Sequence, residues 1–442
     1  MKNKRFVIII TCLLSLFSLC ACNGSSNLSS TINEIPDLTK KLLNDIFSNM
    51  IGEDDLQVPG LGVIAFKDGK AVYENFSGLR EIEKNLPVTK DTRLRIASLS
   101  KMFTVFGIMQ LVEAGKIDID EDVSKYLGFA LRNPKFPNEK ITVRMLASHT
   151  STLRDGESYS LSPKYTLEEF FKTDGVAYEN GNHFGLEDKS YFKYCNLNYG
   201  ILGTIIECVS GKRFDVYIKD NVLKPMNIKA DYVVGNFEEA EFQNLGAIYR
   251  KENGHWSAQV DSYSTQPPKE TVWDNQSLSD YKLGTNATVF SPQGGLRISF
   301  EELGNCLEML INNGIFRGQK IISEASFNEI CKAQWIYDPV TKNGDPYDVM
   351  FIYGLGLYQI DGAGKARLCE KHEIDLIGHS GEAYGLISGL YFRPGMKDGV
   401  IFAINGTGLE VDVDERSMGK FSNSYIWEEE IMNPICENIF VK

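Results

Sequence analysis

The sequence has few of the residues that bind metals or nucleic acids. Its 442 residues include only five histidines. These show no ligand spacing, and no His-Glu-x-x-His motif is present. Lysine and arginine number 46 against 59 aspartates and glutamates, which gives a formal net charge of −13. Because phosphate binding needs basic patches, this balance argues against a nucleic-acid partner. The sequence predicts no metal and no cofactor, and a small-molecule or peptide substrate.

Cysteines are too sparse and unpatterned for a disulfide scaffold or a zinc site. Six follow the N-terminal segment: Cys195, Cys208, Cys306, Cys331, Cys369 and Cys436. Most lie in apolar surroundings, which is typical of buried thiols. We expect buried thiols, and the sequence leaves any pairing among the six open.

The first residues form a targeting segment whose apolar run is short. A basic stretch over 1–5 precedes an apolar run over 6–19, too short to span a bilayer comfortably. The segment ends in Leu-Cys-Ala-Cys, which resembles a bacterial lipobox with Cys22 as the lipidated residue, although cysteine at the second position is unusual. We predict a lipoprotein signal peptide over 1–21, a flexible tether over 22–35, and an extracytoplasmic protein anchored to the bacterial cell membrane. The alternative is plain secretion with cleavage nearby.

Residues 36–442 are predicted to form one domain without repeats or a long linker. A helix is expected over 36–50, and strands over 61–66 and 71–76 flank an Asp-Gly turn. Strands return near the C-terminus, and a mostly helical insertion lies between, at about 98–345. The expected strands at the C-terminal end are 355–360, 386–392 and 400–405, followed by a helix over 422–439. This order predicts an α+β fold: an antiparallel sheet flanked by helices and completed by both chain ends.

Ser98 and Lys101 are the first candidate catalytic residues. Ser-x-x-Lys occurs four times, but only this copy lies between a strand-like run and a long apolar helix. Residues three apart on a helix are neighbours, and a helix apolar all round is buried. Burial favours the neutral amine, which can take the proton that a serine nucleophile must lose. The alternative is a helix N-cap serine beside a solvated lysine.

Three motifs, in order along the chain, resemble those of the serine β-lactamase and penicillin-binding protein superfamily. Arg-Ile-Ala-Ser-Leu-Ser-Lys at 95–101 looks like its nucleophile motif, and Tyr-Cys-Asn at 194–196 is similar to its Tyr-x-Asn motif. His-Ser-Gly at 379–381 resembles its third motif in the histidine form. The branch indicated is that of class C β-lactamases, D-alanyl-D-alanine carboxypeptidases and serine esterases, because class A would show Ser-Asp-Asn and Lys-Thr-Gly.

The resemblance covers most of the chain from about 58 to 405. Thr152 stands where the superfamily usually has glycine, which affects a turn. Residues 153–190 and 231–285 match poorly, and we expect these two segments to shape the substrate site.

The resemblance implies a catalytic unit of three side chains. Ser98 would attack a carbonyl carbon and form an acyl-enzyme, and Lys101 would take its proton. The Tyr194 hydroxyl would pass a proton to the leaving group and later activate water, and the neighbouring Lys101 cation favours the tyrosinate.

The same resemblance implies the substrate contacts. Asn196 would donate a hydrogen bond to a substrate amide. His379, on a strand edge next to Gly381 of the same motif, would bond the tyrosine or a substrate carboxylate. Backbone N–H groups of Ser98 and Glu382 would form the oxyanion hole.

Two other histidine-based interpretations are weaker. Residues 378–382 look like the nucleophile elbow of α/β-hydrolases, but that fold needs a histidine after the serine, and His379 is the last of the five. His149 is expected to order a loop by hydrogen bonding. The sequence thus predicts a serine hydrolase acting on a D-amino-acid peptide, a β-lactam or a small ester. The alternative is a non-catalytic penicillin- or cell-wall-peptide-binding lipoprotein.

Cys22 is predicted to become the lipidated N-terminus. Because a single acyl chain binds membranes only marginally, durable anchoring needs a diacylglyceryl group. Intact-mass analysis of membrane fractions should show a mature chain that begins at Cys22 and carries this group. A soluble mature protein that begins elsewhere would contradict the prediction.

Overall fold

The central strand β1 (Gly60–Lys67) is apolar on both faces, and this fixes the layering of the domain. Leu61 and Val63 pack into one core, whereas Ile64 and Phe66 pack into another. Successive side chains of a strand point to opposite faces, so β1 lies in the middle of three layers. The computed structural model describes residues 35–441, apart from 173–174, 176–182, 189, 273–274, 348 and 412.

Among the described residues the main sheet has nine strands, and both ends of the domain contribute to it, as predicted. All neighbouring strands of this sheet pair in an antiparallel way. The order is β12 (Trp335–Ile336), β13 (Ile352–Tyr353), β14 (Tyr358–Ile360), β15 (Leu376–Ala383), β16 (Leu386–Phe392), β17 (Gly399–Ile404), β1, β2 (Lys70–Glu81) and β3 (Leu86–Pro87).

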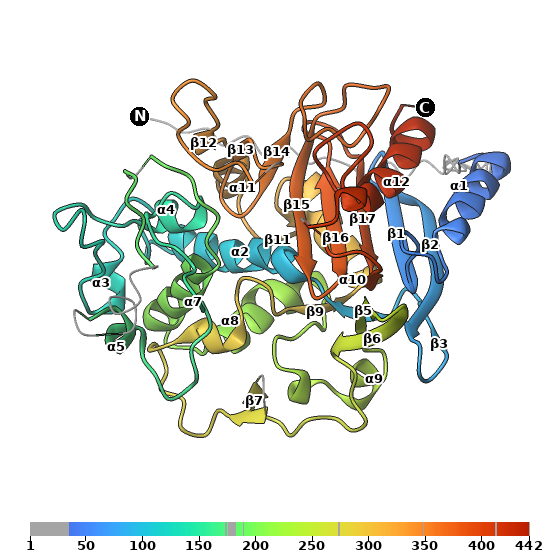
Figure 1. Cartoon of the computed structure of the whole chain (residues 1–442). Helices are drawn as coiled ribbons and strands as arrows, with labels where there is room; N and C mark the ends of the chain where they lie inside the picture. Colours follow the sequence, from blue (N-terminus) through green and yellow to red (C-terminus); the bar gives the residue numbers. More distant parts are fainter. Residues whose placement is uncertain are drawn as a thin grey trace, which may run out of the picture. The chain divides into compact units, whose positions relative to one another are not determined.

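Helices cover both faces of this sheet (Figure 1). The helices α1 (Asp37–Asn49) and α12 (Ile426–Ile435) share one core with Leu61 and Val63. The helices α2 (Ser100–Glu113) and α10 (Phe300–Ile311) lie in the core on the opposite face. The predicted α+β architecture is therefore confirmed.

The segment between β3 and β12 is mostly helical, with short two-stranded pieces. The other helices in the described part of this segment are η1 (Ala97–Leu99), α3 (Ser124–Leu127), α4 (Val143–Ala147), α5 (Leu167–Phe171), α7 (Leu197–Ser210), α8 (Phe214–Ile218), η2 (Lys219–Leu223), η3 (Lys224–Met226), η4 (Val234–Asn236), α9 (Glu239–Phe242), η6 (Ala287–Phe290) and α11 (Glu324–Cys331). Sheet residues resume at β12, before the predicted end of the insertion at 345.

Short strands join segments that are distant in sequence. β4 (Arg93–Arg95) pairs with β9 (Arg297–Ser299), which brings the segment before Ser98 to the segment around residue 295. The other short strands are β5 (Ile248–Glu252), β6 (His255–Val260), β7 (Thr271–Val272), β8 (Gln276–Ser277), β10 (Ile315–Phe316), β11 (Gln319–Lys320) and β18 (Gly406–Thr407).

Two predicted helices differ from the structure at their ends. The chain enters α2 through the 3₁₀ turn η1, so Ser98 lies in a tight turn and not in the α-helix itself. The final α-helix begins at Ile426 and passes at Cys436 into the π-helical turn η8 (Cys436–Phe440). A short 3₁₀ turn, η7 (Glu415–Ser417), precedes it.

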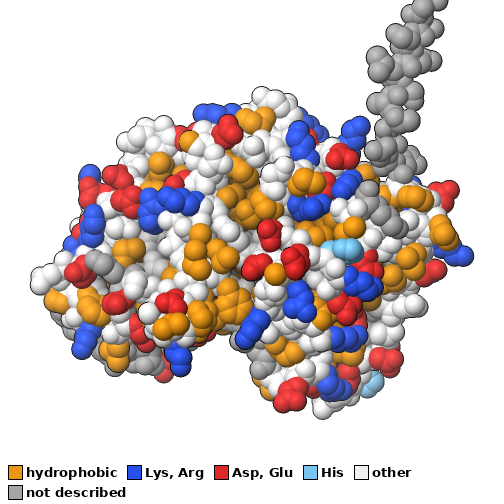
Figure 2. All heavy atoms as spheres, turned by 90° about the horizontal axis from the view of Figure 1, so that it is seen from above, with side chains coloured by type: hydrophobic (Ala, Val, Ile, Leu, Met, Phe, Trp, Pro, Cys, Tyr) orange, Lys and Arg blue, Asp and Glu red, His pale blue; other side chains and the backbone are white. Residues whose placement is uncertain are grey.

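Charged side chains are mixed over the face seen in Figure 2. On its described residues, Lys and Arg side chains lie singly or in small groups among Asp and Glu side chains. In the described part of the chain, no helix is long and apolar enough to cross a bilayer. The predicted signal peptide, Cys22 and nearly all of the predicted tether lie outside the described residues.

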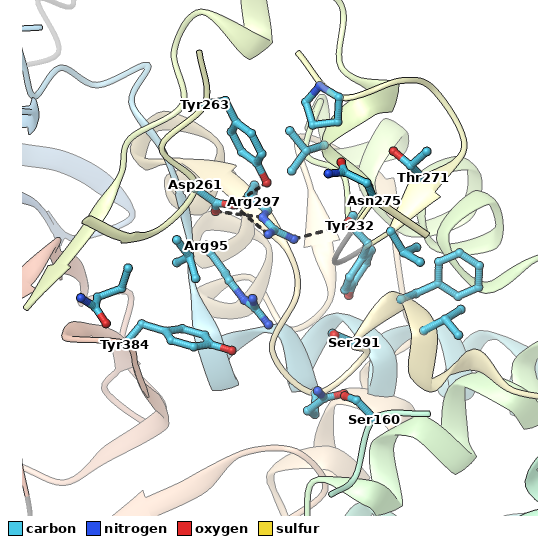
Figure 3. A pocket seen from close by; sticks show the side chains of 18 of the residues that line it. Arg95, Ser160, Tyr232, Asp261, Tyr263, Thr271, Asn275, Ser291, Arg297 and Tyr384 are labelled. Carbon is cyan, nitrogen blue, oxygen red and sulfur yellow. Dashed lines mark hydrogen bonds and ion pairs between the residues drawn. The ribbon is translucent and has the colours of Figure 1, made fainter. Parts of the chain in front are cut away.

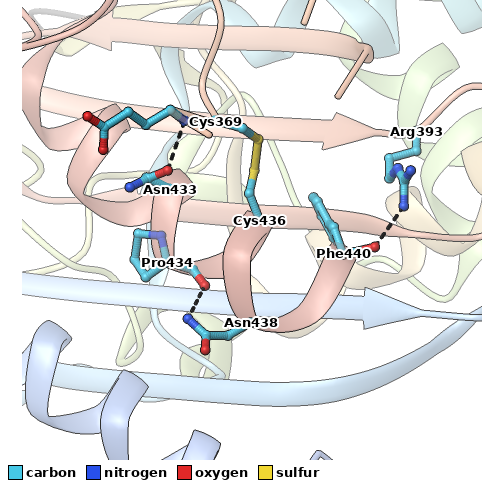
Figure 4. The surroundings of a disulfide bond; sticks show 8 residues. Cys369, Arg393, Asn433, Pro434, Cys436, Asn438 and Phe440 are labelled. Carbon is cyan, nitrogen blue, oxygen red and sulfur yellow. Dashed lines mark hydrogen bonds between the residues drawn. A yellow bond between two sulfur atoms is a disulfide. The ribbon is translucent and has the colours of Figure 1, made fainter. Parts of the chain in front are cut away.

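Cys369 and Cys436 form a disulfide, which corrects the expectation of buried free thiols at these two positions (Figure 4). The sequence alone does not indicate this pairing, because the two cysteines are 67 residues apart and only the packing of α12 brings their segments together. The backbone N–H of Glu370 also donates to Asn433 Oδ1 at 2.9 Å, so the loop and the helix end are tied twice. Cys195 and Cys306 are buried free thiols as expected, whereas the free Cys208 is exposed.

Replacing both disulfide cysteines by alanine should lower the urea midpoint of the oxidised protein. Opening a 67-residue loop returns entropy to the unfolded chain, a loss of up to about 4 kcal/mol in the free energy of unfolding. Cys208→Ser, at an exposed free thiol, is the matched control and should stay within about 0.5 kcal/mol. An unchanged midpoint in the double variant would contradict a stabilising bond.

Candidate active site

Ser98 lies in a sharp turn between β4 and α2. Ala97, just before it, has a φ of 46°, in the left-handed region that residues other than glycine rarely adopt. Ala97 and Leu99 are buried while Ser98 is partly exposed, so the turn presents the hydroxyl of Ser98 to the surface. Strained backbone of this kind persists only where the surrounding structure holds it, and it clusters at functional sites.

Strand β15 runs against this turn at Gly381. A Cβ at this position would lie 2.5 Å from Ile96 O and 3.1 Å from Ser98 N. Only glycine therefore allows this approach. Ser388 Oγ on the neighbouring strand also donates to Ile96 O, at 3.1 Å. The contact brings Glu382, next along the strand and lining the cleft, close to the nucleophile turn; its oxyanion role stays a prediction.

Lys101 is fully buried beneath Ser98. Its Nζ lies 2.9 Å from Ser98 Oγ, 2.8 Å from Asn196 Oδ1 and 3.1 Å from Gln293 O. Burial lowers its pKa to about 7, against the opposing effect of Asp155. A neutral amine has two N–H donors for the two carbonyl oxygens and one lone pair for the serine proton. The geometry suits a general base at neutral pH.

Tyr194 is the second group on the nucleophile. Its Oη lies 2.9 Å from Ser98 Oγ, and Lys101 Nζ lies 4.7 Å from the centroid of its ring. Burial raises the pKa of Tyr194 well above its ordinary value. The expectation that Lys101 favours the tyrosinate is therefore wrong, because desolvation of the phenolate outweighs the nearby cation. Tyr194 is a neutral phenol that can donate a proton.

His149 orders the loop that carries Tyr194, which is the role predicted for it. Its Nδ1 accepts a hydrogen bond from the backbone N–H of Cys195 at 3.1 Å, and its ring lies 4.3 Å from that of Tyr194. Burial and the Lys101 charge lower the pKa of His149 well below its ordinary value, so the ring stays neutral. A neutral ring can accept at Nδ1, which fixes the loop that carries Tyr194.

Asn196 is engaged within the protein. Its Oδ1 accepts from Lys101, and its Nδ2 donates to Asp155 Oδ2 at 2.9 Å. Asp155 Oδ1 accepts from the backbone N–H of Leu197, the first residue of α7, at 2.8 Å. Asp155 thereby turns the amide oxygen of Asn196 toward Lys101. Sequence reasoning missed Asp155, because it begins a segment that matches the superfamily poorly and has no motif of its own.

His379 does not reach the predicted partner. The side chain is fully buried, and its Nε2 lies 3.2 Å from Tyr353 Oη. Its hydrogen bond thus goes to Tyr353 in place of Tyr194. Burial and Lys101 lower the pKa of His379 to about 3, so it carries no charge for a substrate carboxylate. Because side chains alternate along a strand, the next residue, Ser380, lines the cleft.

These groups face a cleft of about 830 Å³, within the range of small-molecule sites. Its lining includes Ser98, Asp155, Tyr194, Asn196, Arg95, Ser380, Glu382 and Tyr384. In the described residues, no three His, Cys, Asp or Glu side chains gather as metal ligands would. The cleft can hold a carbonyl compound against a serine that a lysine and a tyrosine both contact.

The family model described as Beta-lactamase matches residues 43–422. The chain belongs to the beta-lactamase family. The superfamily resemblance of the three motifs is thereby confirmed. This family comprises serine β-lactamases and penicillin-binding proteins, which are generally hydrolytic and take β-lactams or peptides.

Curated members of the family match part of the chain. Protein flp of Staphylococcus aureus (strain MRSA252) is 25% identical over 228 residues, 51% of this chain and 44% of that protein. Penicillin-binding protein 4* of Bacillus subtilis (strain 168) is 28% identical over 171 residues, 37% of this chain and 35% of that protein. The matched part thus spans less than half the length of these two relatives.

Solved beta-lactamase-family structures share the fold. The octameric penicillin-binding protein homologue from Pyrococcus abyssi has a TM-score of 0.59 at 24% identity, over 85% of this chain and 74% of that chain. The penicillin-binding protein from Bacillus halodurans has a TM-score of 0.57 at 20% identity, over 83% and 95%. At these identities the likeness establishes the fold alone.

The partly buried carboxylate of Asp155 should set the pH dependence of Ser98 labelling by a fluorophosphonate. Labelling should rise with pH through about 7, as Lys101 loses its proton. Asp155 raises the pKa of Lys101, so Asp155→Asn should shift this rise to lower pH, on the order of one pH unit. Glu168→Gln, which removes an exposed carboxylate on α5, should leave the profile in place. An unmoved or upward-shifted profile in Asp155→Asn would contradict this electrostatic role.

Proposed function

We propose that the chain is a serine hydrolase that acts through an acyl-enzyme on Ser98. Its substrate is a D-amino-acid peptide, a β-lactam or a small ester. The observation that carries the proposal is the position of Ser98 Oγ, 2.9 Å from both Lys101 Nζ and Tyr194 Oη at the cleft. Family membership supports the chemistry. A solved neighbour of the same fold, SurE, has been determined with D-Leu, which favours a D-amino-acid compound.

Acylation would use Lys101 as the base. The neutral amine takes the Ser98 proton as Oγ attacks the carbonyl carbon, and the carbonyl oxygen becomes an oxyanion. The backbone N–H groups of Ser98 and Glu382 are the proposed donors to that oxygen; such a donor is worth about 10²–10³ in rate elsewhere. The Lys101 ammonium that forms is held by Asn196 Oδ1 and Gln293 O.

Leaving-group departure would use Tyr194, and deacylation would use Lys101. Its neutral hydroxyl donates a proton to the departing nitrogen or oxygen as the carbon–heteroatom bond breaks, and Lys101 returns a proton to the phenolate. Water then attacks the ester carbonyl and passes a proton to Lys101, which gives it to Ser98 Oγ as the ester C–O bond breaks and the acid is released. Because Tyr194 and Lys101 face the same oxygen, they act as one unit on Ser98.

Single and double substitutions test this unit. Ser98→Ala should abolish labelling by a fluorescent penicillin or a fluorophosphonate. Lys101→Met and Tyr194→Phe should each slow acylation by at least about 10³-fold, and the pair should be little worse than the poorer single variant. Ser190→Ala is the matched control, because Ser190 begins another Ser-x-x-Lys but is exposed and bonded to Asp188. Circular dichroism checks the fold.

Turnover separates the proposed enzyme from a binding protein of the same family. A penicillin, a D-Ala-D-Ala peptide and p-nitrophenyl esters should be tested side by side for acylation and product release. Sustained product release from one class identifies the substrate. Undiminished labelling of Ser98→Ala, or normal acylation of either single variant, would contradict the mechanism. A stable acyl-enzyme without release would favour the penicillin-binding alternative.

A further inference from the structure

A second cavity, of about 700 Å³, adjoins the cleft that contains Ser98. The two share the lining residues Arg95, Tyr159, Gln293 and Tyr384, so they form one continuous space. The far walls of the second cavity come largely from residues 232–275, within a segment that matches the superfamily poorly. Ser98 does not line the second cavity, which therefore leads away from the nucleophile.

The second cavity lies on the acyl side of Ser98. Tyr194, which delivers the proton to the leaving group, lines only the cleft, as do Asp345, Val349 and Met350. The leaving group therefore belongs beside Tyr194. The group that stays on Ser98 then extends toward Arg95 and the second cavity.

Arg95 stands where the two spaces meet, with hydrogen-bonding capacity to spare. Its Nε donates to Gly294 O at 2.9 Å, and its guanidinium carbon lies 5.2 Å from the centroid of the Tyr384 ring. Among the described residues, no hydrogen bond or ion pair engages its two terminal nitrogens. Figure 3 shows the Arg95 guanidinium alongside Tyr384 and apart from the neighbouring ion pair of Arg297.

Two other arginines of this region are already paired, and the exposed carboxylate of Glu157 also lines the second cavity. Arg297 makes two hydrogen bonds to Asp261, at 3.0 and 2.9 Å, and two more to backbone oxygens. In the cleft, Arg250 faces Glu382 at 3.6 Å. Arg297 repels the charge of Arg95, and Asp261 offsets part of this repulsion. Among the described residues no carboxylate bonds to the partly buried Arg95, and carboxylates bind guanidinium groups in a bidentate way.

We propose that Arg95 and the second cavity form an acyl-side subsite for a carboxylate carried by the substrate. The acyl part of the substrate would pass along Gln293 and Tyr384, and its carboxylate would bind the terminal nitrogens of Arg95. His379 cannot supply this contact, because it is buried and neutral. This assignment rests on the proposed function and narrows its substrate class to compounds with an anionic acyl group.

Two peptides that differ only at the end of the acyl chain test the subsite. N-succinyl-D-Ala-D-Ala and N-butyryl-D-Ala-D-Ala share the same chain up to its end, where the first carries a carboxylate and the second an uncharged methyl group. Isothermal titration calorimetry with the full chain carrying Ser98→Ala measures binding without turnover. The succinyl peptide should bind about tenfold to a hundredfold more tightly, as expected for hydrogen bonds to a charged group.

Substitution of Arg95 tests whether this residue causes the preference for the succinyl peptide. Arg95→Met, added to Ser98→Ala, should remove the preference, and Arg95→Lys should keep part of it because the charge remains. Arg317→Met is the matched control and should retain the preference, because Arg317 lies in the turn of the remote β10–β11 hairpin and pairs with Glu308 of α10. Thermal melts identify a variant that fails to fold. If Arg95→Met does not fold, the comparison of Arg95→Lys with the Arg95-intact protein still tests the subsite.

The outcomes separate this proposal from the proposed function. Equal affinity for the two peptides with Arg95 intact, or no binding of either, would overturn the subsite. An equal loss for both peptides in Arg95→Met would also overturn it, because it would show a structural role only. Penicillin labelling of Ser98 is measured separately in the wild type. The hydrolase proposal can therefore be correct when the subsite proposal is wrong, and the subsite proposal can be correct when the hydrolase proposal is wrong.

Discussion

The burial of Lys101 is the constraint on which the site depends. An amine with no exposed surface needs a polar partner for each of its hydrogen-bonding groups. Three chain segments supply these partners: Ser98 one turn earlier, Asn196 before α7, and Gln293 in the loop before β9. Exclusion of water is also what lowers the pKa of Lys101 to about 7. The same packing thus places the base and prepares its chemistry.

The loop around Gln293 is the physical link between the nucleophile and the rest of the fold. Pro292 O accepts from Thr104 Oγ1 at 2.9 Å, and the backbone N–H of Leu296 donates to Ser100 Oγ at 3.1 Å. Buried backbone groups need partners, and these bonds satisfy them while pinning the start of α2. β15 closes the other side of Ser98, where Gly381 allows the close approach. The position of Ser98 is therefore determined from two opposite sides.

The sequence predicted what local pattern and family motifs encode. The strand β1, the buried helix α2 and the meeting of Ser98 with Lys101 follow from local pattern and spacing. Contacts between distant segments were not encoded in this way. The pairing of Cys369 with Cys436, and the bond from Asp155 to Asn196, depend on how sheet and loops pack. The protonation of Tyr194 and the partner of His379 were misjudged because burial, which dominates both, cannot be read from a motif.

Burial favours the neutral form of every titratable group at the centre of the active site. It favours the neutral amine of Lys101 and the neutral phenol of Tyr194, and it keeps the rings of His149 and His379 uncharged. The charged side chains lie at the edges of the active site: Asp155 is close to Lys101, and Arg95 lines the second cavity. A neutral centre holds no separated charge in the buried site before a substrate arrives, and the charge created by proton transfer then appears on Lys101 and the substrate oxyanion. Of these two charged side chains, Asp155 acts on the pKa of Lys101, whereas Arg95 is the proposed contact for the substrate. Different residues therefore control the strength of the base and the choice of substrate.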